Sequence, residues 1–246
     1  MRNRISRAAA AAGRQPEQIR LIAVSKTFPA QAVCECIASG QRAYGENYAQ
    51  EGVDKILAVE SMLRGAAAEP DRESKARHAA SGESALGSAL VPPEWHFIGP
   101  IQSNKTRLLA EHFDWVQSID RLKVAQRLAD QRPLDLPPLQ VCVQVNISGE
   151  ATKSGVAPSL LSALVEQVAG LRRLTLRGLM ALPEPTPDSE KQRDQFRRLR
   201  ELKEGLVGRG FALDTLSMGM SDDLEAAVAE GATMVRVGRA IFGERR

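Results

Sequence analysis

Short apolar runs alternate with amphipathic segments along most of the chain. An apolar run of about four to eight residues between turn residues predicts a buried strand. The clearest run covers residues 139–147, where Val141, Val143 and Val145 alternate with Cys142 and polar residues. Eight such runs are centred near residues 21, 44, 96, 116, 143, 178, 216 and 235. The pattern therefore predicts eight consecutive β–α units.

The segments between these strands predict helices, because their apolar positions recur with helical spacing. Ser103 and Asp120 are expected to cap the helices that follow them. The expected helices cover residues 2–13, 30–39, 48–63, a segment after 103, 121–131, 158–169, 188–207, 221–231 and a segment that opens at 238.

Residues 64–92 differ from the rest of the chain. They are rich in Ala, Ser, Glu and Gly, contain almost no large apolar residue before Leu86, and show no period. Such a composition buries too little apolar surface to form a core. We expect a flexible surface insertion between a helix and the next strand, with His78 exposed to solvent.

Repeated β–α units imply parallel strands with crossover helices, and eight units close a TIM-type (β/α)8 barrel. An open doubly wound sheet is the alternative, and it usually carries a glycine-rich phosphate turn after its first strand. Residues 24–29 contain no glycine. We therefore expect an α/β chain that forms a single barrel domain over residues 1–246.

The composition limits the kinds of ligand and partner that we expect. The formal net charge is only +3, and basic residues are interleaved with acidic ones, which does not indicate a nucleic-acid partner. The pI of about 8.9 is compatible with a phosphorylated ligand. Cys34, Cys36 and Cys142 are expected to be buried free thiols rather than disulfide or zinc ligands. No stretch has the length of a membrane span, and we expect a cytoplasmic protein.

The first predicted strand ends at a lysine, Lys26, after the apolar run at residues 21–25. Low-dielectric surroundings at the end of a buried strand disfavour the charged amine and lower its pKa. A partly neutral amine can form a Schiff base with an aldehyde. The alternative is an ordinary lysine whose ammonium group reaches solvent.

The loops after the seventh and eighth strands contain the elements of a phosphate site. In such barrels a phosphate often binds in these two loops. Ser217 ends the seventh strand before Gly219, and the eighth strand runs into Gly238 and Arg239 at the start of a helix. Glycines allow backbone N–H groups to approach an oxyanion, and a helix N-terminus favours negative charge. The alternative is two ordinary turns that use glycine and serine for capping.

Arg236 alternates with Val235 and Val237, so it points into the barrel if the valines face the helices. A buried arginine needs a partner. That partner is either a carboxylate such as Glu46 or a ring nitrogen or anion of a ligand. A Schiff-base lysine, a phosphate site and an arginine in the barrel together suggest pyridoxal 5′-phosphate (PLP).

At this point the sequence resembles the YggS/PROSC-type pyridoxal phosphate homeostasis proteins. The resemblance spans nearly the whole chain and implies a barrel like the N-terminal domain of bacterial alanine racemase. It is carried by LIAVSKT at 21–27, YGENY at 44–48, WHFIGP at 95–100 with Asn104 and Lys105, VNI at 145–147, KSG at 153–155, GLM at 178–180, LSMGMSDD at 216–223 and VRVGRAIFG at 235–243.

The resemblance implies a role for each site residue. Lys26 would hold PLP as an internal aldimine, and Arg236 would face the pyridine nitrogen. Asn47 and Met180 would lie beside the ring, with His96 as a further candidate at the same mouth. The phosphate would be held by Ser217 and by backbone groups of Met218, Gly238 and Arg239.

Other positions either extend the family's pattern or depart from it. Lys153 matches another lysine of the pattern, which is either a transient amine acceptor or a surface charge. Phe28 stands where the family often has a second lysine. The insertion at 64–92 is longer than the family's usual link at this position.

An arginine at the pyridine nitrogen keeps that nitrogen unprotonated and makes the ring a poor electron sink. Alanine racemase adds a tyrosine from a second domain, whereas this chain has only Tyr44 and Tyr48 and no expected second domain. We therefore expect a non-catalytic, monomeric PLP carrier that supplies PLP-dependent acceptor enzymes. The alternatives are an amino-acid racemase and a class I aldolase-like barrel in which Lys26 attacks a phosphorylated carbonyl.

Overall fold

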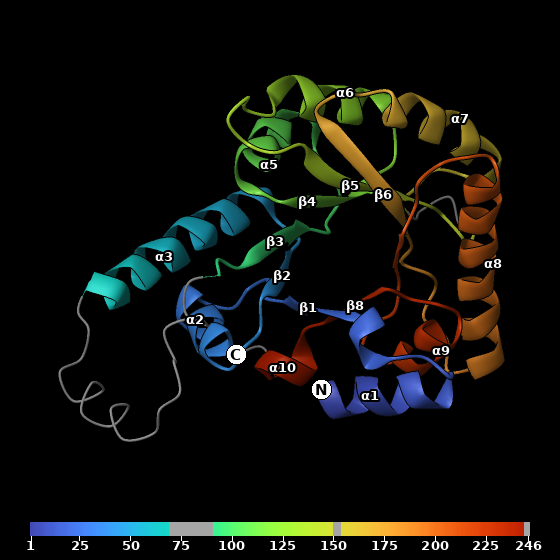
Figure 1. Ribbon diagram of the computed structural model, residues 1–246, viewed down its shortest axis with the longest axis horizontal. Coiled ribbons are helices and arrows are strands. Elements are labelled where there is room, and N and C mark those ends of the chain that lie inside the picture. Colours follow the sequence, from blue (N-terminus) through green and yellow to red (C-terminus); the bar gives the residue numbers. More distant parts are fainter. Residues whose placement is uncertain (69–90, 150–153, 244–246) are drawn as a thin grey trace.

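Eight parallel strands form a closed barrel in the order β1 to β8 (Figure 1). The computed structural model describes residues 1–68, 91–149 and 154–243. The closed barrel confirms the (β/α)8 prediction and rules out the open doubly wound sheet. The strands are β1 (Arg20–Val24), β2 (Ala43–Glu46), β3 (Glu94–Phe97), β4 (Trp115–Ile119), β5 (Leu139–Gln144), β6 (Leu174–Met180), β7 (Thr215–Ser217) and β8 (Met234–Val237).

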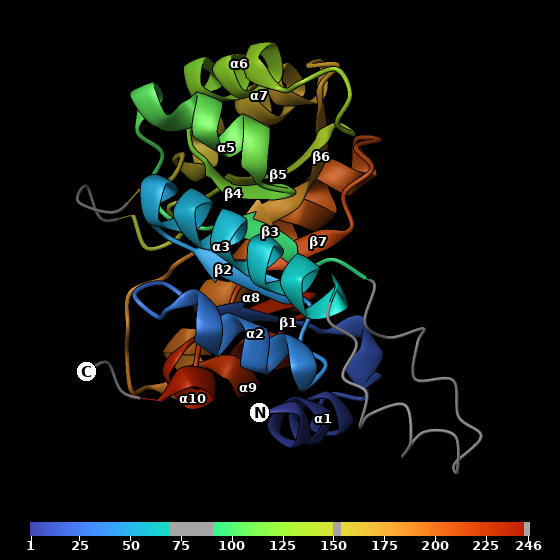
Figure 2. The same ribbon diagram turned by 90° about the vertical axis from the view of Figure 1, so that its left-hand side faces the viewer.

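Helices surround the barrel, and Figure 2 shows α3 lying across β2 and β3. None of the helices in the described ranges is long and apolar enough to cross a membrane. The helices are α1 (Arg2–Ala11), α2 (Ala30–Ala38), α3 (Ala49–Ala68), α5 (Thr106–His112), α6 (Leu122–Gln131), α7 (Pro158–Ala169), α8 (Ser189–Gly208), α9 (Leu224–Ala229) and α10 (Arg239–Phe242), with short 3-10 turns η1 (Pro16–Gln18) and η3 (Ser103–Lys105).

Several helix ends differ from the prediction. Helix α3 continues to Ala68, so the first residues of the predicted insertion are helical, and residues 69–90, with His78, lie outside the described residues. Asp120 does not cap α6 but forms an ion pair with Arg121 at 2.6 Å. Ser103 begins η3 without a side-chain capping bond. These differences change helix ends and leave the order of elements intact.

The barrel closes where β1 pairs with β8. In this register Ile22 lies opposite Arg236 and Ala23 lies opposite Val237. Lys26 follows β1 by two residues, and Gly238 directly follows β8. Closure therefore brings the predicted lysine and the predicted phosphate loop to the same end of the barrel.

Two sets of buried residues hold the fold. The larger core lies between the strands and the helices and includes Val235 and Val237. A smaller set fills the barrel and combines apolar residues with buried polar ones, among them Arg236. The apolar interior residues are Ile22, Ala43, Trp115, Cys142, Met180 and Met234. The inward direction of Arg236, opposite to its neighbouring valines, is confirmed.

Close contact between β6 and β7 leaves no room for a side chain at Gly178. A Cβ atom at this position would lie 1.9 Å from the carbonyl oxygen of Thr215. We expect Gly178→Ala to lower the free energy of unfolding by roughly 1–3 kcal/mol or more, because the paired strands must move apart. Urea unfolding at equilibrium measures this loss.

Gly205 on α8 is the matched control. A Cβ there meets no atom within 4 Å, and Gly205→Ala is expected to stabilise the protein by up to about 1 kcal/mol. An unchanged urea midpoint for Gly178→Ala would contradict the tight strand pairing.

Candidate functional site

A cavity of about 720 Å³ opens at the carboxyl ends of the strands. Most of its lining follows directly after strands β1, β2, β3, β6, β7 and β8. Five of the eight predicted site residues line it: Lys26, Asn47, Arg236, Gly238 and Arg239. The remaining lining residues are Val24, Phe28, Ile98, Leu182, Pro185, Met220, Ser221 and Asp222.

Lys26 lies in a turn between β1 and α2, and a residue of α3 holds this turn. Thr27, the next residue, has a φ of 68°, and a β-branched residue in this left-handed region carries backbone strain. The N–H group of Thr27 donates to Oε1 of Glu51 on α3 at 2.5 Å. The turn is thus fixed by a contact outside the barrel.

A buried ion pair lies beneath this turn. Lys55 on α3 donates from Nζ to Oε1 of Glu46 at 2.7 Å and to the carbonyl oxygen of Ser25 at 2.6 Å. Its third acceptor is Oε1 of Glu51 at 3.0 Å. The Ser25 hydroxyl donates to Oε1 of Glu46 at 2.6 Å. Burial raises the pKa of Glu46, and the charge of Lys55 opposes that shift.

The prediction that Glu46 could be the partner of Arg236 is wrong. Glu46 was the structural candidate to neutralise Arg236, but its partners are Lys55 and Ser25. It lies at the end of β2 with no exposed surface, on the side of the barrel wall that faces α3. Its carboxylate therefore supports the Lys26 turn and leaves Arg236 with other partners.

Arg236 is 3% exposed and lines the cavity from within the barrel. It donates from one terminal nitrogen to Oγ of Ser217 at 2.5 Å and from the other to the carbonyl oxygen of Ala181 at 2.8 Å. Burial lowers the pKa of Arg236 to about 10, so the guanidinium stays protonated at neutral pH. Because a guanidinium has five N–H donors, it retains donors for an acceptor on a ligand.

Three predicted site residues do not line the cavity. Ser217 is fully buried and donates to Oε1 of Gln117 at 2.6 Å. The N–H group of Met218 donates to the carbonyl oxygen of Met234 at 3.1 Å, and a bond to a phosphate would have to replace this one. Met180 is fully buried among the apolar residues inside the barrel.

Ser221 takes a place at the cavity that the sequence pattern did not assign to it. A helix was expected from residue 221, whereas α9 begins at Leu224. Gly219 has a φ of 94°, and a Cβ there would lie 2.5 Å from Cβ of Ala227. This glycine turn brings Met220, Ser221 and Asp222 to the cavity. The glycine between the two serines was the available signal.

Apolar side chains form one wall of the cavity. Phe28 stacks on Phe242 of α10 with ring centroids 5.0 Å apart. The position that the family often gives to a second lysine is therefore part of an aromatic contact. His96, the further candidate for the mouth, is fully buried inside the barrel and does not line the cavity. Lys153 lies outside the described residues.

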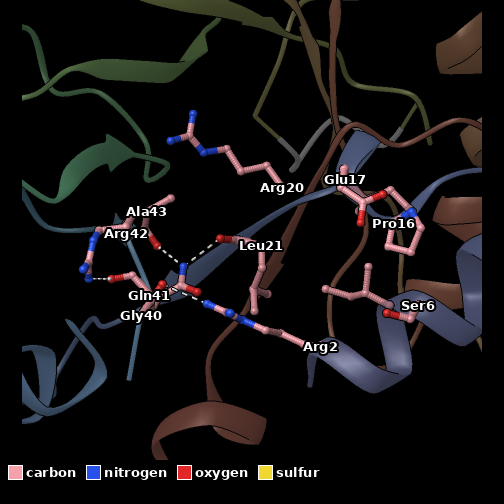
Figure 3. Close-up of a pocket in the computed structure, with 12 residues that line it drawn as sticks. Arg2, Ser6, Pro16, Glu17, Arg20, Leu21, Gly40, Gln41, Arg42 and Ala43 are labelled. Carbon is pink, nitrogen blue, oxygen red and sulfur yellow. Dashed lines mark hydrogen bonds between the residues drawn. The ribbon is translucent and has the colours of Figure 1, made fainter. Parts of the chain in front are cut away.

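A second cavity of about 420 Å³ lies near the amino ends of β1 and β2 (Figure 3). Several of its polar groups already bond to the backbone: Arg2 donates to Gly40, Gln41 to Leu21 and Ala43, and Arg42 to Ile37. Figure 3 shows Arg20 lying apart from these bonded groups.

The part of the chain that the structure describes contains no cluster of three His, Cys, Asp or Glu residues fit for a metal ion. Cys34, Cys36 and Cys142 are all free thiols, but the prediction that they are buried holds only for Cys142, because Cys34 and Cys36 are half-buried.

The ion pair beneath the Lys26 turn generates a prediction about stability. Lys55→Met leaves the buried carboxyl of Glu46 without its cation, and we expect a loss of about 3–5 kcal/mol in unfolding free energy at neutral pH. The folded-state pKa of Glu46 would then lie still further above its unfolded value. Because the folded state then binds a proton more readily, the loss shrinks as the pH falls. Urea unfolding of both proteins at several pH values measures the difference.

The control adds Glu46→Gln to Lys55→Met. Removing the unpaired charge is expected to recover part of the stability and to remove the pH dependence of the loss. A loss that is constant with pH would show that Lys55 acts through packing alone.

Comparisons with known proteins show the family of this chain. Residues 1–246 match the family described as alanine racemase, N-terminal domain. The chain is 54% identical over 242 residues to the pyridoxal phosphate homeostasis protein of Pseudomonas aeruginosa, covering 98% of this chain and 91% of that protein. It is 51% identical over 245 residues to the protein of the same name from Escherichia coli K12, covering 100% and 94%.

A solved structure extends the similarity to three dimensions. PipY of Synechococcus elongatus PCC7942, solved with PLP bound, superimposes with a TM-score of 0.75 at 32% identity, covering 97% of this chain and 99% of PipY. The chain thus belongs to the alanine racemase N-terminal domain family, together with its relatives the pyridoxal phosphate homeostasis proteins.

Proposed function

We propose that this chain binds PLP in the cavity at the carboxyl ends of its strands, with Lys26 joined to the PLP aldehyde as a Schiff base. It would hold the cofactor and release it to PLP-dependent acceptor enzymes, with little or no catalysis of its own. The observation that carries the proposal is that Lys26, in the turn after β1, and Arg236, on the paired strand β8, line the same cavity. The names of the relatives and the PLP-bound state of PipY support it.

The cavity fits PLP in charge and chemistry. The charged side chains that line it are Lys26, Arg236, Arg239 and Asp222, a net positive set that suits a phosphorylated ligand. When bound, PLP supplies an aldehyde that a lysine amine captures and can exchange for another amine. Arg236 holds N–H donors inside the barrel, where a ring nitrogen can accept them.

The phosphate is assigned to the loops after β7 and β8. Gly238 and Arg239 line the cavity at the first turn of α10, whose leading N–H groups have no acceptor within the helix. Ser221 adds a hydroxyl from the neighbouring loop. We propose Ser221 as the phosphate-binding serine, and Ser217 as a residue that supports Arg236 from inside the barrel.

The arrangement of these residues favours retention of PLP over catalysis. A protonated Arg236 keeps the ring nitrogen unprotonated, which weakens the ring as an electron sink. Tyr44 is fully buried with its hydroxyl near the carbonyl oxygen of Gln41, and Tyr48 is 57% exposed; neither lines the cavity. The carboxylate that lines it, Asp222, has a side chain that is 88% exposed. A two-base racemization therefore has little support.

The exposed rim offers a route for release. The side chain of Arg239 is 71% exposed and that of Asp222 is 88% exposed, so solvent reaches this side of the cavity. An amine of an acceptor enzyme could approach the cavity from this side, where Arg239 and Asp222 are exposed.

The visible spectrum tests the cofactor site. We expect the protein with PLP to be yellow, borohydride to remove the band, and peptide mass mapping to place the pyridoxyl group on Lys26. Lys26→Ala should lose the adduct. Lys123→Ala, which removes an exposed lysine on α6, should keep it.

Other outcomes separate the alternatives. A colourless protein that takes up no PLP refutes the proposal, and trapping of a sugar phosphate without PLP supports the aldolase-like alternative. Racemization of an amino acid with a turnover on the order of 10 per second supports the racemase.

The phosphate assignment has its own test. We expect Ser221→Ala to weaken PLP binding by roughly 10-fold to 100-fold, because a hydrogen bond to a charged group is lost. Pyridoxal, which lacks the phosphate, should bind both proteins equally. Fluorescence titration of the two ligands measures the difference. A similar loss for both ligands would show that Ser221 does not contact the phosphate.

A further inference from the structure

Polar side chains form a continuous chain of hydrogen bonds through the barrel, from Arg236 at the cavity to Glu94 at the opposite mouth. Its inner members, Ser217, Gln117 and His96, are all fully buried. The links are Arg236 to Oγ of Ser217 at 2.5 Å, Ser217 to Oε1 of Gln117 at 2.6 Å, Nε2 of Gln117 to Nδ1 of His96 at 2.9 Å, and Nε2 of His96 to Oε1 of Glu94 at 2.6 Å.

The bonds of this chain have consistent directions when His96 is neutral. Glu94 is a carboxylate and only accepts, so His96 donates to it from Nε2. A neutral His96 then has a bare Nδ1, which accepts from the amide nitrogen of Gln117. At the other end Arg236 only donates, so Ser217 accepts from it, and Ser217 donates its own hydrogen to the amide oxygen of Gln117. The contacts at both ends agree on one orientation of the Gln117 amide.

Two further contacts hold this arrangement. The amide nitrogen of Gln117 also lies 3.5 Å from Sδ of Met234, so inverting the amide would lose this contact as well as the bond to His96. Burial lowers the pKa of His96 and favours its neutral form. The charged groups that face His96 are Glu94 on β3, Arg20 on β1 and Asp114 before β4, and Arg20 also pairs with Glu94 at 2.8 Å.

The chain of bonds takes the place of a counter-ion. Arg236 has no carboxylate within ion-pair distance in the described ranges. Its terminal nitrogens are held by a hydroxyl and a carbonyl. The hydroxyl of Ser217 accepts from Arg236 and donates its own hydrogen to Gln117, whose amide nitrogen contacts His96. The chain of bonds therefore links His96 to the guanidinium of Arg236.

We infer that His96 and Gln117 are positioning residues for the cofactor site, acting on Arg236 through Ser217. Neutral His96, protonated at Nε2, orients Gln117 so that Arg236 presents its remaining donors to the ring nitrogen of the ligand. This inference rests on the proposed function for its ligand. The hydrogen-bond direction itself is a property of the protein without PLP.

Nuclear magnetic resonance tests that direction directly. The chain has three histidines, and His96→Gln identifies the signals of His96. Long-range ¹H–¹⁵N correlation is expected to show His96 neutral and protonated at Nε2 near neutral pH. Gln117→Glu replaces the donor nitrogen by a second acceptor oxygen, so His96 should become protonated at both nitrogens. A wild-type His96 protonated at Nδ1, or an unchanged His96 in Gln117→Glu, overturns the inference.

A pair of ligands tests the action on Arg236. PLP and its 1-deaza analogue differ at the ring nitrogen, the atom assigned to Arg236. We expect His96→Leu to weaken PLP binding by about tenfold, the size of one hydrogen bond, and to leave the deaza analogue nearly unchanged. His96→Gln, which offers an amide oxygen to Gln117 and an N–H to Glu94, should bind both ligands as the wild type does.

The outcomes distinguish this inference from the proposed function. Equal losses for PLP and the deaza analogue in His96→Leu, or no loss for either, overturn the inference and leave the proposed function intact. If His96→Leu does not fold, His96→Gln takes its place as the test. A tenfold loss of PLP affinity in His96→Gln then also overturns the inference and leaves the proposed function intact. A wild-type protein that binds neither ligand refutes the proposed function, and the positioning role falls with it.

Discussion

The pairing of β1 with β8 is the constraint on which the site depends. The first and last strands meet in a register that sets Ile22 opposite Arg236. That register places the turn with Lys26 beside the loop that begins at Gly238. Selective binding of a phosphorylated aldehyde under the proposed function needs both features, because an amine alone does not select for a phosphate and an anion-binding loop alone does not select for an aldehyde. Barrel closure makes them parts of one cavity.

The buried cations Lys55 and Arg236 have different kinds of partner. Lys55 and Glu46 form a direct ion pair supported by Ser25. Arg236 instead bonds to a hydroxyl and a carbonyl oxygen. A carboxylate partner would have occupied the fork of the guanidinium and cancelled its charge. Neutral partners hold Arg236 in place and leave its charge and several donors facing the cavity.

The sequence predicts the fold because the period of its apolar residues marks the strands, and five of the eight predicted site residues line the cavity. Apolar runs mark all eight strands, and the alternation of Arg236 with two valines predicts that its side chain points into the barrel. The sequence does not predict that Glu46 pairs with Lys55, because their contact depends on how α3 packs against the barrel. It also does not distinguish Ser217 from Ser221, because a left-handed glycine between them decides which serine reaches the cavity.

Under the proposed function, the same structural features favour retention of a ligand over its chemical transformation. Groups beneath the Lys26 turn and behind Arg236 are buried and hydrogen-bonded to one another, so they fix geometry and are not placed to exchange protons with a substrate. Apolar side chains such as Phe28, and the exposed carboxylate of Asp222, face the remaining space. Catalysis needs a second acid or base on the side of the cofactor opposite the lysine. Retention needs only a rigid binding cavity with one side exposed to solvent. Buried groups make one side of the cavity rigid, and solvent reaches the other side at Arg239 and Asp222, which is the exit that the proposed function requires.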